Sequence, residues 1–496
     1  MKKEVIVGLL VVFTILMISS LLQAQVNATE EQKKVDKAYT CLQNNVRGNC
    51  STLSTEEKIF ALLAVSQCKT ELISDSFNNG ECWSSTPNDA CGIKTTAQAI
   101  LALKDASSST QTAQNWILSQ NKSTTELNWY LQIESSEATS CTIDYTQSSY
   151  TLEIGEDKKI NSDAGSCLSL AKDNYWLQIS PSCYGQELLV SCDKGFSTNL
   201  LFSKADSSII YVLSNIHGAN AEGTTTEKVE SACFAENNFC TYEGTLWAAL
   251  TLDSLNEDAS AYLPYLITLA DDNLRFLPDA FLYLIKPSDS SYKTSLLSKQ
   301  ISNRWWTTSG DKYYDTALAL YPFLGQNIPE KANAKQWLLE SQDSNGCWQG
   351  DHIRNTAFVL ASVWPKKITS GGGSTTLPSC EPGNSCVASS SICTNAEGQI
   401  LSSQYSCSGF SVCCSVQPKQ PTCIEQNGEK CSFDQICQGG NFVSASDITG
   451  QKCCVGGGVC KTQQETSYTC KPPVGTCRPS GCLSDATITT SYTCQQ

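Results

Sequence analysis

One stretch of the chain gathers residue types that can do chemistry. Residues 337–361 read WLLESQDSNGCWQGDHIRNTAFVLA and contain Trp348, Asp351 and His352, one of only two histidines in the sequence. An aromatic ring beside an acid is a common lining for sugars and for cationic ligands. Similar groupings elsewhere extend the set of candidate binding residues to Glu243, Trp247, Trp306, Asp315, Trp348, Asp351 and His352. The same residues also fit a structural role, with the tryptophans filling gaps between helices and His352 starting a helix, and we favour this interpretation.

Familiar catalytic chemistry finds little support in the sequence. No Gly-x-Ser-x-Gly nucleophile motif occurs, and two histidines leave few options for a histidine-dependent nucleophile. Carboxylates are numerous, so an acid/base pair of the glycosidase kind stays open, but no particular pair stands out. Asp343, Cys347 and His352 could be drawn together as a zinc site, yet Cys347 is better explained by a disulfide. We predict no catalytic residue, no metal site and no cofactor, and lean against an enzyme.

The N-terminus predicts export. A basic start and an apolar run over 5–22 precede small residues that fit cleavage of a signal peptide after Ala28 or Ala24. The run is also just long enough to remain as an uncleaved anchor. The 28 cysteines suit an oxidising compartment, and the net charge of −15 argues against nucleic-acid binding. We therefore expect an extracellular or cell-surface protein that contacts a membrane only if residues 1–28 stay attached.

Two kinds of helix alternate along much of the chain. The first kind is rich in alanine, begins beside a threonine and repeats apolar residues at i, i+3, i+4 and i+7, as in 95–105, 244–255, 315–325 and 355–364. The second kind has an aromatic or long apolar stripe and ends in Gln or Asn, as in 35–45, 111–121 and 331–342. Such helical hairpins cannot bury their apolar faces alone, so we expect neighbouring hairpins to stack.

The last hairpin carries a family resemblance. Trp337-Leu338, three residues, Gln342, three more residues and Gly346-Cys347-Trp348 resemble the QW repeat of terpenoid cyclases. The alanine-rich helices resemble the inner helices of the same α/α-toroid superfamily, which includes squalene cyclases, protein prenyltransferase β subunits and thioester domains. The resemblance implies a mainly α fold, an α/α toroid of helical hairpins. It also implies that the candidate binding residues surround the mouth of a cavity.

The catalytic motifs of that superfamily are missing. The chain has no Asp-x-Asp-Asp acid for isoprenoid cyclisation, no Asp-x-Cys and His zinc site for prenyl transfer, and no Gly-Cys-Gly-Glu-Gln thioester run. The resemblance therefore implies the fold without the known activities.

The domain boundaries follow from shifts in composition. Period-two alternation predicts a small β domain inserted between the hairpins. A Gly/Ser/Thr linker then precedes a cysteine-dense tail whose spacing repeats, which predicts disulfide-stapled modules. We expect a signal or anchor at 1–28, helical parts at 29–123 and 205–367, the β domain at 124–204, the linker at 368–379 and three cysteine-rich modules at 380–496. Closeness in sequence predicts the disulfides Cys41–Cys50, Cys82–Cys91, Cys183–Cys192 and Cys233–Cys240.

These observations favour a non-catalytic extracellular binding or adhesion protein whose ligand is a glycan, a lipid or a protein. The alternative is an extracellular enzyme that acts on polysaccharide or lipid, including isoprenoids, inside the helical cavity. Acids that converge on an open cavity would favour the enzyme. A cavity filled by tryptophans would defeat it.

Overall fold

The computed structural model describes residues 29–366 except 87, 88, 125 and 214, together with shorter stretches between 380 and 477. The expected signal segment, the linker and most of the third cysteine-rich module lie outside the described residues. The chain divides into two compact units, one ending at Pro418 and the other beginning at Lys419. No described helix has the length and apolar character needed to cross a membrane.

The fold class is α+β, with 38% helix and 25% strand, so the prediction of a mainly α toroid is wrong. Thirteen antiparallel strands are described between residues 121 and 240, and many of them have only two to five residues. Strands this short carry too little alternation to be predicted from sequence. The disulfide-rich C-terminal region is confirmed.

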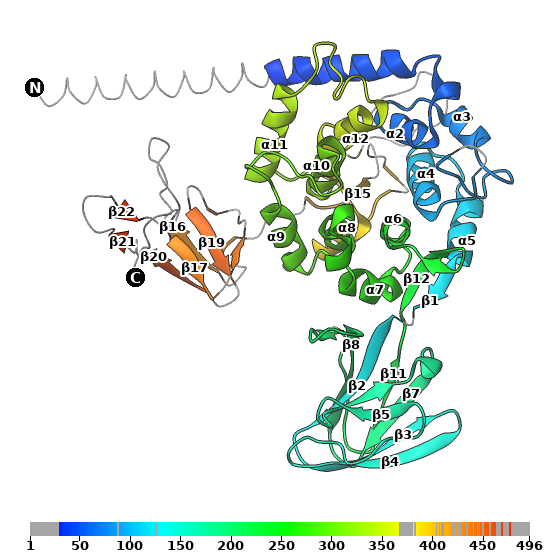
Figure 1. Cartoon of the computed structure of the whole chain (residues 1–496), viewed down its shortest axis with the longest axis vertical. Coiled ribbons are helices and arrows are strands. Elements are labelled where there is room, and N and C mark those ends of the chain that lie inside the picture. The colour runs from blue at the N-terminus through cyan, green and yellow to red at the C-terminus, as the bar shows by residue number, and fades with distance from the viewer. Residues whose placement is uncertain are drawn as a thin grey trace, which may run out of the picture. The chain divides into compact units, whose positions relative to one another are not determined.

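Six helices enclose the main apolar core of the first unit (Figure 1). Neighbours pack in chain order, the short 3-10 turn Tyr321–Phe323 bridges the fourth and fifth, and the last packs against the first. These inner helices are α2 (Thr55–Val65), α4 (Ile93–Asp105), α6 (Tyr242–Ser254), α8 (Pro278–Ile285), α10 (Lys312–Leu320) and α12 (Ile353–Val363). Outside them lie helical residues 29–46 and α3 (Lys69–Ser74), α5 (Gln111–Ser119), α7 (Leu263–Thr268), α9 (Ser290–Ser298) and α11 (Pro329–Glu340).

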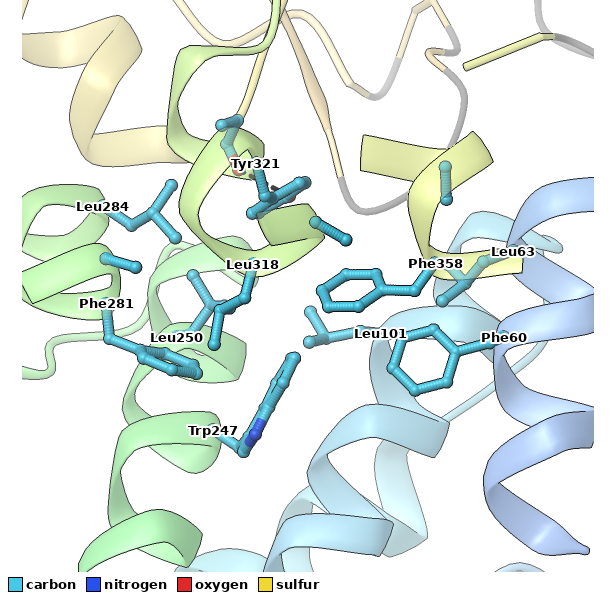
Figure 2. Close-up of a cluster of buried hydrophobic side chains, with 14 of the residues drawn as sticks. Phe60, Leu63, Leu101, Trp247, Leu250, Phe281, Leu284, Leu318, Tyr321 and Phe358 are labelled. Carbon is cyan, nitrogen blue, oxygen red and sulfur yellow. Dashed lines mark hydrogen bonds between the residues drawn. The ribbon is translucent and has the colours of Figure 1, made fainter. Parts of the chain in front are cut away.

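The middle of the inner helices is filled by apolar side chains. Figure 2 shows Phe60, Trp247, Phe281 and Phe358 meeting there with leucines from neighbouring helices. Each of the four aromatic rings is almost completely buried. Burying one such side chain contributes about 1.5–3 kcal/mol, so this cluster is a principal source of stability for the helical part.

A hydrogen-bonded unit repeats at the turns between outer and inner helices. The indole N–H groups of Trp83, Trp306 and Trp348 donate to the carbonyls of Leu72, Leu296 and Leu338 at 2.7, 2.7 and 2.8 Å. The backbone N–H of each tryptophan donates to a threonine hydroxyl of the next inner helix: Thr96, Thr316 and Thr356, at 3.0, 3.0 and 3.1 Å. Phe234 makes the same backbone bond to Thr245 at 3.0 Å. This unit explains why a threonine stands near the start of each of these four helices.

The β region consists of two antiparallel sheets with a shared apolar core. One sheet has the order β10-β8-β2-β6-β5, with β9 also paired to β8, and the other has the order β11-β7-β3-β4. Their strands are β2 (Leu127–Ser135), β3 (Thr139–Tyr145), β4 (Ser148–Ile154), β5 (Leu168–Ala171), β6 (Trp176–Ile179), β7 (Glu187–Cys192), β8 (Phe196–Lys204), β9 (Tyr211–Val212), β10 (His217–Ala219) and β11 (Thr224–Lys228). A third small sheet of β1 (Asn121–Ser123), β12 (Ala232–Glu236) and β13 (Phe239–Cys240) joins this region to the helices (Figure 1).

Disulfides cross-link both parts of the first unit. The structure joins Cys82 to Cys91 and Cys233 to Cys240, two of the four pairs predicted from closeness in sequence. The expected Cys41–Cys50 bond is replaced by Cys41–Cys347 and Cys50–Cys68. Cys41 lies on a helix that packs beside the loop of Cys347, so tertiary contact decides its partner.

The expected Cys183–Cys192 bond is likewise replaced, by Cys141–Cys192 and Cys167–Cys183. Cys141 and Cys192 face each other in the register of β3 and β7, with their Cα atoms 4.0 Å apart. Sheet pairing therefore overrides closeness in sequence.

The first cysteine-rich segment packs on the helices and belongs to the first unit. It contains β14 (Ser385–Val387), α13 (Ser390–Asn395) and β15 (Val412–Cys414), held by Cys380–Cys413, Cys386–Cys407 and Cys393–Cys414. The Tyr321 hydroxyl donates to the Ala388 carbonyl at 2.8 Å, and the Ser389 hydroxyl donates to the Leu284 carbonyl at 2.6 Å. The segment thus covers the C-terminal ends of α8 and α10.

The second unit is a small disulfide-linked β structure. Its described strands are β16 (Glu429–Ser432), β17 (Gln435–Gln438), β18 (Asn441–Val443), β19 (Gln451–Val455), β20 (Val459–Thr462), β21 (Tyr468–Thr469) and β22 (Thr476–Cys477). The bonds Cys423–Cys453, Cys431–Cys460 and Cys437–Cys454 cross-link it. Few apolar side chains are buried among its described residues, so the cross-links supply much of its constraint.

Candidate functional site

Charged side chains meet where the inner helices begin. Lys94 Nζ lies 2.8 Å from Glu243 Oε1 and 3.7 Å from Glu56 Oε1. The Arg354 guanidinium reaches Glu56 Oε2 at 3.2 Å and Asp311 Oδ2 at 2.6 Å. These contacts form one chain of alternating charge, Glu243, Lys94, Glu56, Arg354 and Asp311, which we call the ion-pair chain. Every charged member has an opposite charge beside it, an arrangement that holds helix ends together.

A buried phenol lies next to the ion-pair chain. The Arg354 guanidinium carbon lies 4.9 Å from the ring centre of Tyr314, and the same ring packs against Phe60 and Phe358. Among the described residues, neither the Tyr314 hydroxyl nor Glu56 Oε1 has a hydrogen-bond partner. Burial, followed by the negative charges of Glu56 and Glu243, raises the pKa of Tyr314 well above its usual value. The phenol therefore stays protonated at neutral pH and cannot serve there as a base.

The acidic candidates do not converge on a common point. Glu243 belongs to the ion-pair chain. The Asp315 carboxylate is buried and accepts the Thr308 N–H at 2.6 Å and the Ser309 N–H and hydroxyl at 2.8 Å each. Burial raises the pKa of Asp315, and the bonds from Ser309 and Thr308 act in the opposite direction. Asp315 thus anchors the loop before α10.

The residues of the 337–361 stretch have structural partners. His352 caps α12, with its Nδ1 accepting the Asn355 N–H at 3.4 Å. Asp351 is exposed and contacts the Asn345 amide. The Gln342 amide donates to the Lys34 carbonyl at 2.9 Å and to the Gly346 carbonyl at 2.7 Å. These contacts fix the turn before α12.

The three candidate tryptophans are interior residues. Trp306 and Trp348 are fully buried in the repeated tryptophan–threonine unit, and Trp247 packs edge-on against Phe281 with ring centres 5.0 Å apart. They fill the helical part and do not line an opening.

Sequence reasoning missed Glu56, Lys94, Asp311, Arg354 and Tyr314. A signal existed, because each lies at or beside the first turn of an apolar helix, where polar side chains of neighbouring helices can meet.

Grooves lie elsewhere on the first unit. One of about 710 Å³ runs between helical residues 29–46 and α11, where Lys335 Nζ pairs with Glu31 Oε1 at 2.5 Å. Burial and the nearby Lys335 lower the pKa of Lys331 in this groove to about 8. A second, of about 360 Å³, lies under the first cysteine-rich segment, and a third, of about 650 Å³, lies in the β region. None of these three is lined by a candidate residue from the sequence.

Clusters with metal-ligand geometry contain oxidised sulfur. Among the described residues, Cys41, Cys347 and Asp351 form one such cluster, and Cys380, Cys407 and Cys413 form another. All five cysteines are in disulfides, so they offer no thiolate to a metal.

No family model matches the chain, and no curated protein or solved structure shows significant similarity to it. The resemblance to terpenoid cyclases and prenyltransferases is therefore corrected: neither a matching relative nor the α+β fold supports it. The spacing read as a QW repeat corresponds here to the Trp348, Leu338 and Thr356 hydrogen-bonded unit.

Proposed function

We propose that this chain is an exported protein that binds an extracellular ligand without transforming it. The main support is the filled centre of the inner helices, where Phe60, Trp247, Phe281 and Phe358 occupy the space that a substrate chamber would need (Figure 2). A protein whose polar groups serve stability in its interior is expected to present its functional groups on exposed surfaces.

The disulfides support the extracellular location. Twelve are described, and they occur in the helices, the β region and both cysteine-rich segments. Disulfides persist in oxidising compartments and are rare where thiols are kept reduced. Cross-linked segments with little core are typical of small extracellular recognition modules.

The contacts of the acidic candidate residues argue against the alternative, an extracellular enzyme. A glycosidase needs a pair of carboxyl groups facing one substrate bond. In the inner helices, Glu243 is paired with Lys94, and Asp315 is occupied by the N–H groups of its own loop. No specific observation favours hydrolysis, so a second function is not proposed.

Binding and turnover can be separated in one experiment. The full chain, produced with its disulfides in an oxidising host, would be tested against immobilised polysaccharides, lipid vesicles and extracellular matrix proteins, while product release is followed from the same polysaccharides and lipids. We expect saturable binding to one class and no product. Release of product that disappears in both Glu243→Gln and Asp315→Asn would establish the enzyme and overturn the proposal.

A further inference from the structure

A polar groove of about 650 Å³ lies at one end of the β11-β7-β3-β4 sheet. The β3–β4 turn forms one wall, with Thr146 and Gln147 both at positive φ. The segment Gly185–Glu187 and Lys228 of β11 form the other. The groove therefore spans the strand ends of this sheet and the adjoining turns, and turns are common places for recognition.

Several polar side chains of this groove make no hydrogen bond or ion pair with the described part of the protein itself. Among the described residues, no hydrogen bond or ion pair engages the side chains of Asp144, Gln147, Ser149 or Glu187, and Gln186 Oε1 is buried without a hydrogen-bond partner. The ion-pair chain differs, because all of its charges are matched within the fold. Asp144, Gln147, Ser149 and Glu187 are exposed and free to bind a ligand. The buried Gln186 Oε1 beside them, without a partner among the described residues, indicates a ligand that supplies the missing bond.

The sheet holds these groups in a fixed order. Asp144 lies opposite Ser149 on one side and opposite Leu189 on the other, and Glu187 lies opposite Lys228. Tyr145, a buried residue that lines the groove, stacks on Tyr150 with ring centres 5.0 Å apart. The Tyr145 hydroxyl also donates to the Ala164 carbonyl at 2.6 Å. The groove thus has a rigid floor, which lowers the entropy lost on binding.

The chemistry matches a compound with many hydroxyl groups. Carboxylates accept hydrogen bonds, a lysine ammonium donates them, and amides and serine hydroxyls do both. Leu189, which is 38% exposed, adds an apolar surface for the C–H face of a sugar ring. Such a mixture of both hydrogen-bonding roles with one apolar contact suits an oligosaccharide.

The charge of the groove selects among oligosaccharides. Asp144 and Glu187 contribute two negative charges, and the one cation, Lys228, also pairs with Glu230 at 2.9 Å. Sulfated or uronic-acid glycans would be repelled, more so by a chain of net charge −15. We propose that this groove binds a neutral oligosaccharide, an inference that rests on the proposed binding function and names its ligand class and site.

Titration calorimetry of the full disulfide-bonded chain with cellohexaose, chitohexaose and mannohexaose tests the proposal, with heparin as the anionic comparison. We expect saturable binding of at least one neutral hexasaccharide and weaker binding of heparin. Asp144→Ala and Gln186→Ala should each weaken the affinity about tenfold, which corresponds to one or two lost hydrogen bonds. Thr224→Ala, an exposed hydroxyl on the same sheet outside the groove, should bind as the wild type does.

Gln147→Ala, at the exposed turn, replaces Gln186→Ala if that variant does not fold. Absence of binding to all three neutral hexasaccharides overturns the groove assignment, as does tighter binding of heparin. Hexasaccharide binding that survives every groove variant also overturns it but leaves the proposed binding function standing. Failure of the proposed function itself would show as product release or as no binding to any of the polysaccharides, vesicles and matrix proteins.

Discussion

Cys41 and Cys347 are joined by a disulfide across a sequence separation of 306 residues. The bond attaches helical residues 29–46 to the turn before α12. Beside it, Lys37 Nζ donates to the Ser344 carbonyl at 2.5 Å, and the Tyr39 hydroxyl donates to the Trp364 carbonyl at 2.7 Å. The first and last parts of the helical region are therefore fastened to each other, which holds α2 against α12.

Removing this bond should cost more stability than removing a short-range one. Cross-linking restricts the unfolded chain more as the closed loop grows, so Cys41→Ser/Cys347→Ser should lower the free energy of unfolding by about 4–5 kcal/mol. Cys82→Ser/Cys91→Ser, whose cysteines are 9 residues apart, should cost about 2–3 kcal/mol. Guanidinium unfolding without reductant measures both. Equal losses would show that the long bond adds no constraint beyond that of the contacts around it.

Gly346 should tolerate no side chain, because it combines a left-handed backbone with a close neighbour. Its φ is +103°, and an added Cβ would lie 2.7 Å from the Lys37 carbonyl oxygen. We expect Gly346→Ala to destabilise the protein by about 2–4 kcal/mol. Gly350 is the matched control: its φ is +65°, and a Cβ there would meet nothing within 4 Å. Gly350→Ala should therefore cost only about 1 kcal/mol. If thermal unfolding shifted equally in both variants, packing against Lys37 would have no part in the effect.

The repeated tryptophan–threonine unit predicts a specific dependence on a hydroxyl group. Thr316 Oγ1 accepts the buried backbone N–H of Trp306 at 3.0 Å. Thr316→Val keeps the shape but leaves that N–H without an acceptor, so it should cost about 2 kcal/mol. Thr316→Ser retains the acceptor and should recover much of the loss. Urea unfolding of the two variants compares them, and a serine variant as unstable as the valine variant would contradict this role of the hydroxyl.

The helices could be predicted because the spacing of their apolar residues shows which positions face the core. Ala357, Leu360 and Ala361 repeat at helical spacing, and all three are buried in α12. The fold class could not be predicted, because strands such as β9 and β10 have two or three residues and form only when β8 lies beside them. Local pattern does not specify such pairing.

Contacts between residues that lie far apart in the sequence could not be predicted either. Glu56, Lys94 and Arg354 come from three different helices, and their contact depends on α12 packing against α2. The groove of the β region joins a turn, a loop and an edge strand, and its residues have types common on any surface. Their lack of internal partners becomes visible only in the folded chain.

Asp253 should make stability depend on pH through the docking of the first cysteine-rich segment. Its buried carboxylate accepts the N–H groups of Ser390 and Ser391 at 3.2 Å each, at the start of α13. Burial raises the pKa of Asp253 to about 6, and the bonds from Ser391 and Ser390 and the charge of Lys104 act in the opposite direction.

The sign follows from comparing folded and unfolded states. An unfolded aspartate titrates near its ordinary value of 3.8, so between that pH and about 6 the folded state holds a proton that the unfolded state has released. The destabilising effect of this group is complete above about pH 6 and disappears as the pH falls toward 4, a change of at most about 3 kcal/mol.

Denaturant unfolding of wild type and Asp253→Asn between about pH 4 and pH 7 isolates this group, because the other acids titrate alike in both proteins. The wild type should gain stability relative to the variant as the pH falls through about 6. Ser391→Ala removes a hydrogen bond that favours the carboxylate, so its transition should move to higher pH. Parallel pH profiles for wild type and Asp253→Asn would mean that the Asp253 carboxyl keeps its ordinary pKa beneath the segment.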